Sequence, residues 1–204
     1  MCHNLRIWQR SSPVFVEFYK KNPFYGSLIF VDTETTGVTQ DADIIELGAI
    51  SIAPTDDASV EFNIFSELIY PRKGVYISLS AFKKHGITER ELKKYGKPPK
   101  KTLDMFIKWI KSKSPDYLVA HNAGFDENML YNDMMKHGIN YNLPEFLCTV
   151  KMARKLKKAG IITTPNAKLA TLADYFDCPI KPKHRSISDA EACAYIFAKM
   201  MLLS

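Results

Sequence analysis

The sequence predicts an α/β fold: a central mixed five-stranded sheet, three antiparallel strands followed by parallel ones, flanked by helices. Residues 28–31 form a short apolar run of the kind that is buried on both faces of a sheet. Residues 44–52 and 60–70 are two further strand patterns joined by a turn sequence, and consecutive strands with short connections pair antiparallel. From residue 116 the chain follows a strand–turn–helix order, which is typical of α/β proteins.

Length and composition describe one globular domain of ordinary size. The chain has 204 residues, of which 46% are hydrophobic and 25% charged. No apolar run approaches the roughly 18 residues that a membrane helix needs, and the first residues lack the pattern of a secretion signal. The four cysteines show no zinc-type spacing and are expected to be reduced thiols. These features argue against a membrane protein and predict a cytoplasmic, intracellular location.

Residues 1–27 precede the first core strand and are interpreted as an N-terminal extension of a domain that comprises residues 28–204. Ser12 and Pro13 predict the start of a short helix with an apolar stripe. This helix either packs on the domain or docks a protein partner. An organellar presequence is a third alternative, because the extension holds four basic side chains and one acidic side chain.

The second half of the chain alternates helices with short strands. Thr88 and Glu91 form a capping box, and Ser188 with Glu191 predicts a second one at the start of the last helix. The strands that complete the sheet are expected at residues 116–121 and 146–150. Helices are expected from about residue 102, from about residue 125, over 151–158, across 169–176 and from 188 onwards.

Two carboxylates stand at the end of the first strand. Asp32 and Glu34 project from the same face, about 7 Å apart along the backbone, because side chains alternate along a strand. Like charges in a partly desolvated place are unfavourable unless a cation lies between them. Carboxylate oxygens suit Mg²⁺ or Mn²⁺. The alternative is a strand that simply runs into an acidic turn. Glu46 in the second strand is interpreted as a polar strand position and not as a catalytic group.

Three further polar residues follow strands or begin helices. Asp126 and Asp189 fall in first helical turns, where a carboxylate also complements the helix dipole, and His184 lies on the loop before the last helix. Each alone has a structural explanation. Together with the first two carboxylates they gather where an α/β sheet holds its functional groups. Four carboxylates and one histidine are what two-metal hydrolysis of a phosphodiester requires.

Charge is divided unevenly along the chain. Residues 28–78 hold nine acidic and two basic side chains, a net of −7, whereas residues 79–204 hold 22 basic and 12 acidic ones, a net of +10. An acidic, cation-binding part beside a basic part that attracts phosphates is what a nuclease needs. The densest positive patch, residues 151–158, is the predicted contact with a nucleic-acid backbone.

Three motifs carry a resemblance to a known family. DTETTG at 32–37, HNAGFD at 121–126 and HRSISDA at 184–190 resemble the exonuclease motifs of the DEDDh branch of DnaQ-like 3′→5′ exonucleases. HGIT at 85–88 and CTVKMARKL at 148–156 are similar to stretches of bacterial proofreading-subunit-like members, such as the exonuclease domain of the polymerase III epsilon subunit. The resemblance implies an RNase H-like fold and the release of nucleoside 5′-monophosphates from a 3′ end.

The resemblance also implies roles for single residues, with two Mg²⁺ or Mn²⁺ ions as cofactors. His184 would be the general base, and Asp32 would bridge both ions. The metal ligands would be Asp32, Glu34, Asp126 and Asp189. The residues beside the terminal nucleotide would be Thr33, Thr35, His85 and Asn122.

Three functions remain open at this point. The first is hydrolysis of DNA, with single-stranded 3′ ends as the expected substrate. The second is trimming of RNA by the same fold, because the motifs specify phosphodiester chemistry and not the sugar. The third is a non-catalytic nucleic-acid-binding module. Proofreading subunits usually carry a further polymerase-binding segment, whereas this sequence ends at Ser204, so a stand-alone nuclease is expected.

Overall fold

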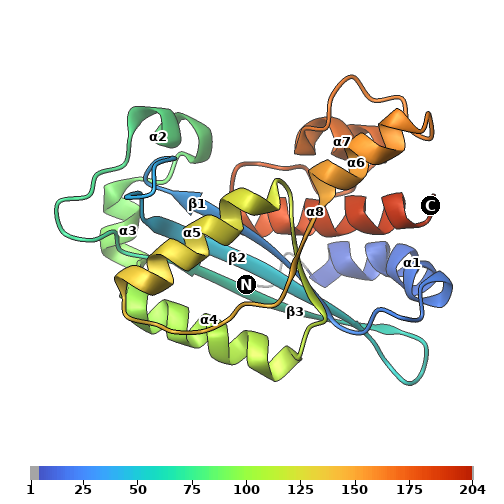
Figure 1. Ribbon diagram of the computed structural model, residues 1–204, viewed down its shortest axis with the longest axis horizontal. Coiled ribbons are helices and arrows are strands. Elements are labelled where there is room, and N and C mark those ends of the chain that lie inside the picture. Colours follow the sequence, from blue (N-terminus) through green and yellow to red (C-terminus); the bar gives the residue numbers. More distant parts are fainter. Residues whose placement is uncertain (1–4, 204) are drawn as a thin grey trace.

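One mixed sheet forms the centre of the molecule (Figure 1). The computed structural model describes the backbone of residues 5–203 and the side chains of residues 13–203. The strands lie in the order β3-β2-β1-β4-β5. They are β1 (Leu28–Thr35), β2 (Ile44–Pro54), β3 (Val60–Leu68), β4 (Tyr117–Ala120) and β5 (Phe146–Cys148). β1, β2 and β3 pair antiparallel, while β4 and β5 continue the sheet in parallel. The predicted five-stranded mixed sheet is confirmed.

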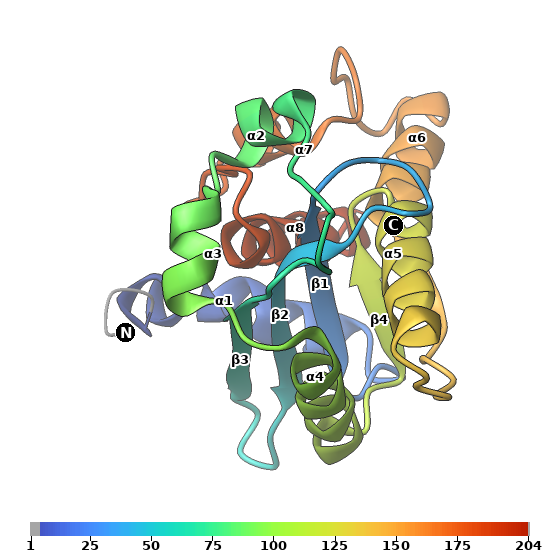
Figure 2. The ribbon, with the colours of Figure 1, turned by 90° about the vertical axis from the view of Figure 1, so that its left-hand side faces the viewer.

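Helices cover both faces of the sheet, as Figures 1 and 2 show. One core cluster joins the sheet to α1, α6, α7 and α8, and a second joins it to α4 and α5. The small helices α2 and α3 lie between β3 and α4 in the chain. The helices are α1 (Leu5–Lys21), α2 (Leu79–His85), α3 (Glu89–Tyr95), α4 (Pro99–Lys113), α5 (Ala123–Lys136), α6 (Thr149–Lys158), α7 (Leu169–Tyr175) and α8 (Ser186–Met201).

The apolar start of β1 is buried on both sides, as its sequence predicts. Leu28 and Phe30 belong to the cluster under α8, whereas Ile29 and Val31 belong to the cluster under α4 and α5. All four are essentially inaccessible to solvent. Because burial of such side chains contributes about 1.5–3 kcal/mol each, β1 is firmly fixed. The polar residues that follow along the same strand therefore start from a rigid base.

Helix α1 differs from its prediction at its beginning. It starts at Leu5 and runs through Pro13, whereas the sequence rule places proline in the first turn and so predicts a start near Ser12. The predicted apolar stripe is buried: Phe18 packs edge-on against Phe197 of α8, with ring centroids 5.6 Å apart. The Tyr19 hydroxyl donates a 2.7 Å hydrogen bond to the carbonyl oxygen of Ile52 in β2. Packing on the domain is thus part of what this helix does.

The two predicted capping boxes have different outcomes. Thr88 caps α3 as expected, because its hydroxyl oxygen accepts a 3.1 Å hydrogen bond from the Glu91 amide. The box at Ser188 is wrong: α8 already begins at Ser186, and the Ser188 hydroxyl donates to the Arg185 carbonyl oxygen at 3.0 Å. Within the described part of the chain, each helix is too short or too polar to cross a bilayer.

Candidate active site

Asp32 and Glu34 occupy the last half of β1, on the face that packs against α8. Their partners across the antiparallel pair are Gly48 and Glu46 of β2, and cross-strand partners project from the same face. Asp32 and Glu34 are both partly buried. The strand therefore delivers two carboxylates, and β2 a third, to one small area at the end of the sheet.

Gly48 allows α8 to begin directly on this area. A side chain at this position would place its Cβ within 2.6 Å of the carbonyl carbon of Ser186, at the first residue of α8. That spacing is far below van der Waals contact, so only glycine permits the approach. A glycine inside a strand pattern often marks such close packing, and this was the feature of the sequence that could have located the helix. As a result Asp189, in the first turn of α8, lies over the end of β1.

Asp126 reaches the site from the other neighbour of β1. The pairing between β1 and β4 extends only to Phe30 and Val119, so the edge of β1 is open beyond that point. Asp126 lies in the first turn of α5 and fills this opening. Its carboxylate accepts hydrogen bonds from the amide of Thr33 at 2.9 Å and from the hydroxyl of Thr33 at 2.8 Å. Asp126 is therefore held rigidly beside Asp32.

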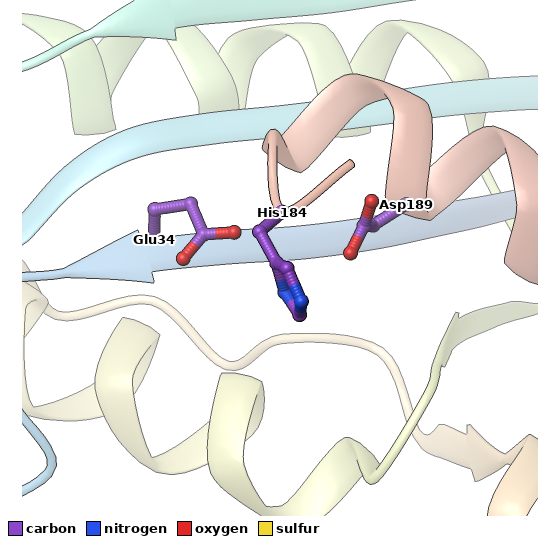
Figure 3. A group of neighbouring side chains, drawn as sticks. All are labelled: Glu34, His184 and Asp189. Atoms are coloured by element: carbon purple, nitrogen blue, oxygen red, sulfur yellow. The ribbon is translucent and has the colours of Figure 1, made fainter. Parts of the chain in front are cut away.

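His184 completes the group from the loop that precedes α8, as Figure 3 shows. One potential ligand atom from each of Glu34, His184 and Asp189 lies within 4.8 Å of the others. His184 is exposed and has a left-handed backbone conformation, with φ of 52°. The Asp189 carboxylate accepts a 2.9 Å hydrogen bond from the amide of Lys183. The five residues singled out in the sequence thus converge from β1, α5, the 182–185 loop and α8.

The carboxyl groups at this site are buried and crowded, which makes their negative charges unfavourable. Burial raises the pKa of Asp32 well above its usual range, and the charges of Asp126, Asp189 and Glu34 raise it further. Burial, together with Asp189 and Glu46, raises the pKa of Glu34 to about 8. Each carboxylate is therefore costly to ionise in the presence of the others.

The pKa values of the other two carboxyl groups, Asp126 and Asp189, are also raised by burial, and hydrogen bonds offset part of each rise. Burial raises the pKa of Asp126, although the hydrogen bonds from Thr33 lower it in part. Burial also raises the pKa of Asp189, against the Lys183 amide and the charge of His184. A divalent cation among these oxygens would remove the cost of ionisation. The carboxylate oxygens are a donor set that fits Mg²⁺ or Mn²⁺.

Arg185 and the Ser186 amide connect the His184 loop to β2 through Glu46, and the sequence analysis predicted neither interaction. The carboxylate of Glu46 accepts hydrogen bonds from the Arg185 guanidinium at 2.8 and 2.5 Å and from the Ser186 amide at 2.7 Å. Glu46 is 4% exposed. The interpretation of Glu46 as a mere polar strand position is therefore incomplete, because its carboxylate holds the start of α8.

A small cavity of about 90 Å³ adjoins Glu34. His85 is 6% exposed there, its Nδ1 accepts a 2.9 Å hydrogen bond from the Ile87 amide, and its Nε2 has no hydrogen-bond partner within the described residues. The Thr33 hydroxyl is engaged by Asp126, and the Thr35 hydroxyl donates to the Gly37 carbonyl. The lining residues are Thr33, Glu34, Thr35, Gly37, Val38, Ser80, Ala81, Lys84, His85 and Phe125.

Asn122 is the one predicted substrate-binding residue outside this lining. It is exposed, adopts φ of 68° in the turn between β4 and α5, and makes no side-chain cap of α5. Three of the four predicted substrate-binding residues therefore line one cavity beside Glu34, and Asn122 stands apart at the surface.

The fold and this cluster of carboxylates define the class of the protein as a nuclease of the RNase H-like fold. A family model described as Exonuclease (RNase_T) matches residues 29–197, nearly the whole chain. The chain belongs to this exonuclease family. The resemblance to DnaQ-like 3′→5′ exonucleases is thereby confirmed, and with it the class of enzyme, a 3′→5′ exonuclease. Exonucleases of this family use divalent metal ions.

A curated relative and two solved structures agree with this assignment. The chain is 32% identical to the PolC-type DNA polymerase III of Caldanaerobacter subterraneus subsp. tengcongensis, over 86% of this chain and 12% of that protein. It therefore spans about an eighth of the length of that relative. E. coli exonuclease I, solved with a dA16 oligonucleotide, is similar over 87% of this chain and 40% of that one, with a TM-score of 0.70 and 14% identity.

The second structural neighbour is a 3′-exonuclease solved with a histone mRNA stem-loop. The similarity extends over 91% of this chain and 70% of that one, with a TM-score of 0.70 and 16% sequence identity. At these low identities the two solved structures establish the fold and not the substrate.

Proposed function

We propose that this chain removes nucleotides from the 3′ end of single-stranded DNA and releases nucleoside 5′-monophosphates, with two divalent metal ions. The observation that carries the proposal is the convergence of Asp32, Glu34, Asp126, Asp189 and His184 at the end of β1. DNA is favoured because the PolC-type relative is a DNA polymerase. Single strands are favoured because exonuclease I was solved with an oligonucleotide.

The carboxylates divide into two groups in this proposal. Glu34 and Asp189, which lie close together, would hold one Mg²⁺ or Mn²⁺ ion with Asp32. Asp32 and Asp126, whose carboxylate is fixed beside Thr33, would hold the second ion. Bound divalent ions would lower the pKa of the attacking water and stabilise negative charge on the phosphate.

His184 is proposed as the general base. Its imidazole stands next to Glu34 and Asp189 and is exposed to solvent, so it can accept the proton of the attacking water and pass it to bulk water. His85 lines the pocket that adjoins Glu34 and is proposed to contact the terminal nucleotide. Thr33, Thr35 and Asn122 are proposed to lie beside the same nucleotide.

An exoribonuclease is the second candidate. The observation that favours it is the structural similarity to the 3′-exonuclease solved with a histone mRNA stem-loop. A non-catalytic binding module is disfavoured, because all five motif residues are intact, and Glu34, His184 and Asp189 bring potential ligand atoms within 4.8 Å of one another.

A matched pair of substrates tests the proposed function. Single-stranded DNA and RNA of one sequence, labelled at the 5′ end, are incubated with the protein and Mg²⁺ or Mn²⁺. A ladder that shortens from the 3′ end faster on DNA, and that EDTA abolishes, is the expected result. Faster shortening of RNA would select the second candidate. Binding of both without shortening of either would overturn the enzymatic proposal.

The basic helix α6 is the proposed contact with the nucleic-acid backbone. Replacing the exposed Lys155, Lys157 and Lys158 with alanine is expected to weaken binding of single-stranded DNA and to reduce the slope of log K against log salt by about 2. With each phosphate contact that is lost, binding releases fewer counterions from the DNA. Fluorescence anisotropy at several salt concentrations measures the slope.

The control makes the same charge change elsewhere. Lys101, Lys108 and Lys111 are equally exposed on α4, which belongs to the core cluster on the opposite face of the sheet. Alanine at these three positions should leave the slope close to its original value. Equal slopes for both triple variants would refute the placement of the strand along α6.

The organisation and setting of the chain also remain proposals. Residues 1–27 are proposed as an extension of an exonuclease domain formed by residues 28–204, and a protein partner would contact the part of α1 that is not buried against α8 and β2. A cytoplasmic location accords with three unpaired cysteines among the described residues, Cys148, Cys178 and Cys193.

A further inference from the structure

Glu46 is a buried carboxylate that the proposed reaction does not use. It lies directly across the strand pair from Glu34 and is 4% exposed. Both of its oxygens are occupied: Oε1 accepts from the Arg185 guanidinium at 2.8 and 2.5 Å, and Oε2 accepts from the Ser186 amide at 2.7 Å. A carboxylate whose two oxygens are already bound to protein donors is poorly placed to hold a metal ion, so its purpose lies elsewhere.

The residues that Glu46 binds follow His184 immediately. His184 is exposed, so packing does not fix its imidazole, and its backbone has the left-handed φ of 52° that a non-glycine residue adopts only at a cost. On its other side the Lys183 amide is held by the Asp189 carboxylate at 2.9 Å. The backbone on both sides of His184 is therefore fixed by hydrogen bonds to two buried carboxylates.

Arg185 connects this loop to a third element. Its guanidinium also lies 3.4 Å from the carboxylate of Glu91 in α3. Arg185 also donates from Nε and from one terminal nitrogen to Oε1 of Glu46. Charge-assisted hydrogen bonds such as these are among the strongest in proteins, and the pair of them fixes the orientation of the guanidinium. The loop is thus tied to β2 and to α3 at the residue next to the proposed base.

We propose that Glu46 is a positioning residue: through Arg185 and the Ser186 amide it sets His184 in place opposite Glu34 and Asp189. The proposal rests on the proposed role of His184 as the general base. It assigns to Glu46 no contact with substrate or metal. Removal of the carboxylate would therefore slow the chemical step and leave the binding of substrate and cations largely unchanged.

The test substitutes Glu46→Gln. Glutamine keeps the size of the side chain but has one carbonyl oxygen, so it can accept from Arg185 or from Ser186 and not from both. The expected result is a kcat lowered by about 10–100-fold, with KM changed by no more than about 2-fold. This is the range found when a residue that orients a metal ligand through a hydrogen bond is replaced. Hydrogen exchange of the 183–189 amides should accelerate, and Mn²⁺ binding measured by calorimetry should be unchanged. Glu67→Gln is the matched control, because Glu67 pairs with Lys97 at 2.6 Å on the same sheet.

A double-substitution cycle separates this proposal from the proposed function. If His184→Ala lowers kcat strongly and Glu46→Gln has little further effect in that background, the positioning role is supported. If the two effects multiply in full, Glu46 does not act through His184 and the proposal fails. If His184→Ala alone leaves kcat unchanged, the proposed base is wrong instead.

A second variant covers the case in which Glu46→Gln does not fold. Arg185→Lys leaves the Ser186 amide bonded to Glu46 and keeps a cation nearby, on a side chain that is 40% exposed. A lysine ammonium cannot reproduce the forked guanidinium contact. A lower kcat that disappears in the His184→Ala background supports the proposal, and an unchanged kcat with unchanged exchange of the 183–189 amides overturns it.

Discussion

Asp32→Asn is expected to lower kcat by at least about 10³-fold and yet to leave the metal-free protein as stable as before, or more stable. Loss of a ligand that the proposal assigns to both ions removes several kcal/mol of charge stabilisation in the transition state, which corresponds to a rate loss of this size. Asparagine keeps the shape of the side chain and removes an ionisable group whose negative charge burial and four neighbouring carboxylates make unfavourable. Single-turnover kinetics and thermal melting in EDTA measure the two effects.

The opposite signs of the two effects make this prediction specific. An ordinary core substitution lowers activity because it lowers stability, whereas here activity should fall while the melting temperature in EDTA holds or rises. Melting with added Mg²⁺ should then show less stabilisation than in the original protein. Asp104→Asn on α4 is the control, since Asp104 lies outside the cluster. A large fall in melting temperature in EDTA would mean that Asp32 supports the fold rather than a cation site.

The sequence predicted the central strands well because their pattern is local. The apolar run of β1, the turn after β2 and the cap at Thr88 are each decided by a few adjacent residues. The three motifs also identified the five residues that meet at the end of β1, although their meeting depends on the fold. A buried strand ending in Asp32 and Glu34 sets one side of the site from sequence alone.

The supporting contacts were not predictable, because they join residues far apart in the chain. Glu46 and Arg185 are separated by 139 positions, and Thr33 and Asp126 by 93. No periodicity relates such pairs. The N-cap of α8 was misplaced by three residues, at Ser188 instead of Arg185, because Ser188 suits a cap, while the Glu46 carboxylate binds the Ser186 amide at the true start of the helix. Tertiary contacts thus overrode local preference at the site itself.

Stability of the metal-free protein is expected to fall as pH rises from about 4 to about 8. The pKa of Glu34 rises from 4.5 to about 8, and those of Asp32, Asp126 and Asp189 rise as well. A carboxyl whose pKa is higher in the folded than in the unfolded state stabilises the fold fully below the unfolded value, and that contribution is lost as pH passes the folded value. For Glu34 alone, at about 1.4 kcal/mol per pKa unit and reduced for its partial exposure, the loss is on the order of 3 kcal/mol. Urea unfolding in EDTA between pH 5 and 8.5 measures it.

Metal ions should reverse this dependence, which distinguishes a cation site from an acidic patch. In saturating Mg²⁺ the ionised carboxylates become ligands, so the decline with pH should shrink or change sign, because binding strengthens as protons leave. Glu34→Gln should flatten the curve in EDTA, since it removes one titrating group, whereas Glu67→Gln should leave the curve unchanged. Parallel curves with and without Mg²⁺ would mean that the four carboxylates do not share a bound cation. The two-metal proposal would then lose its physical basis even if the chain proved to be an active nuclease.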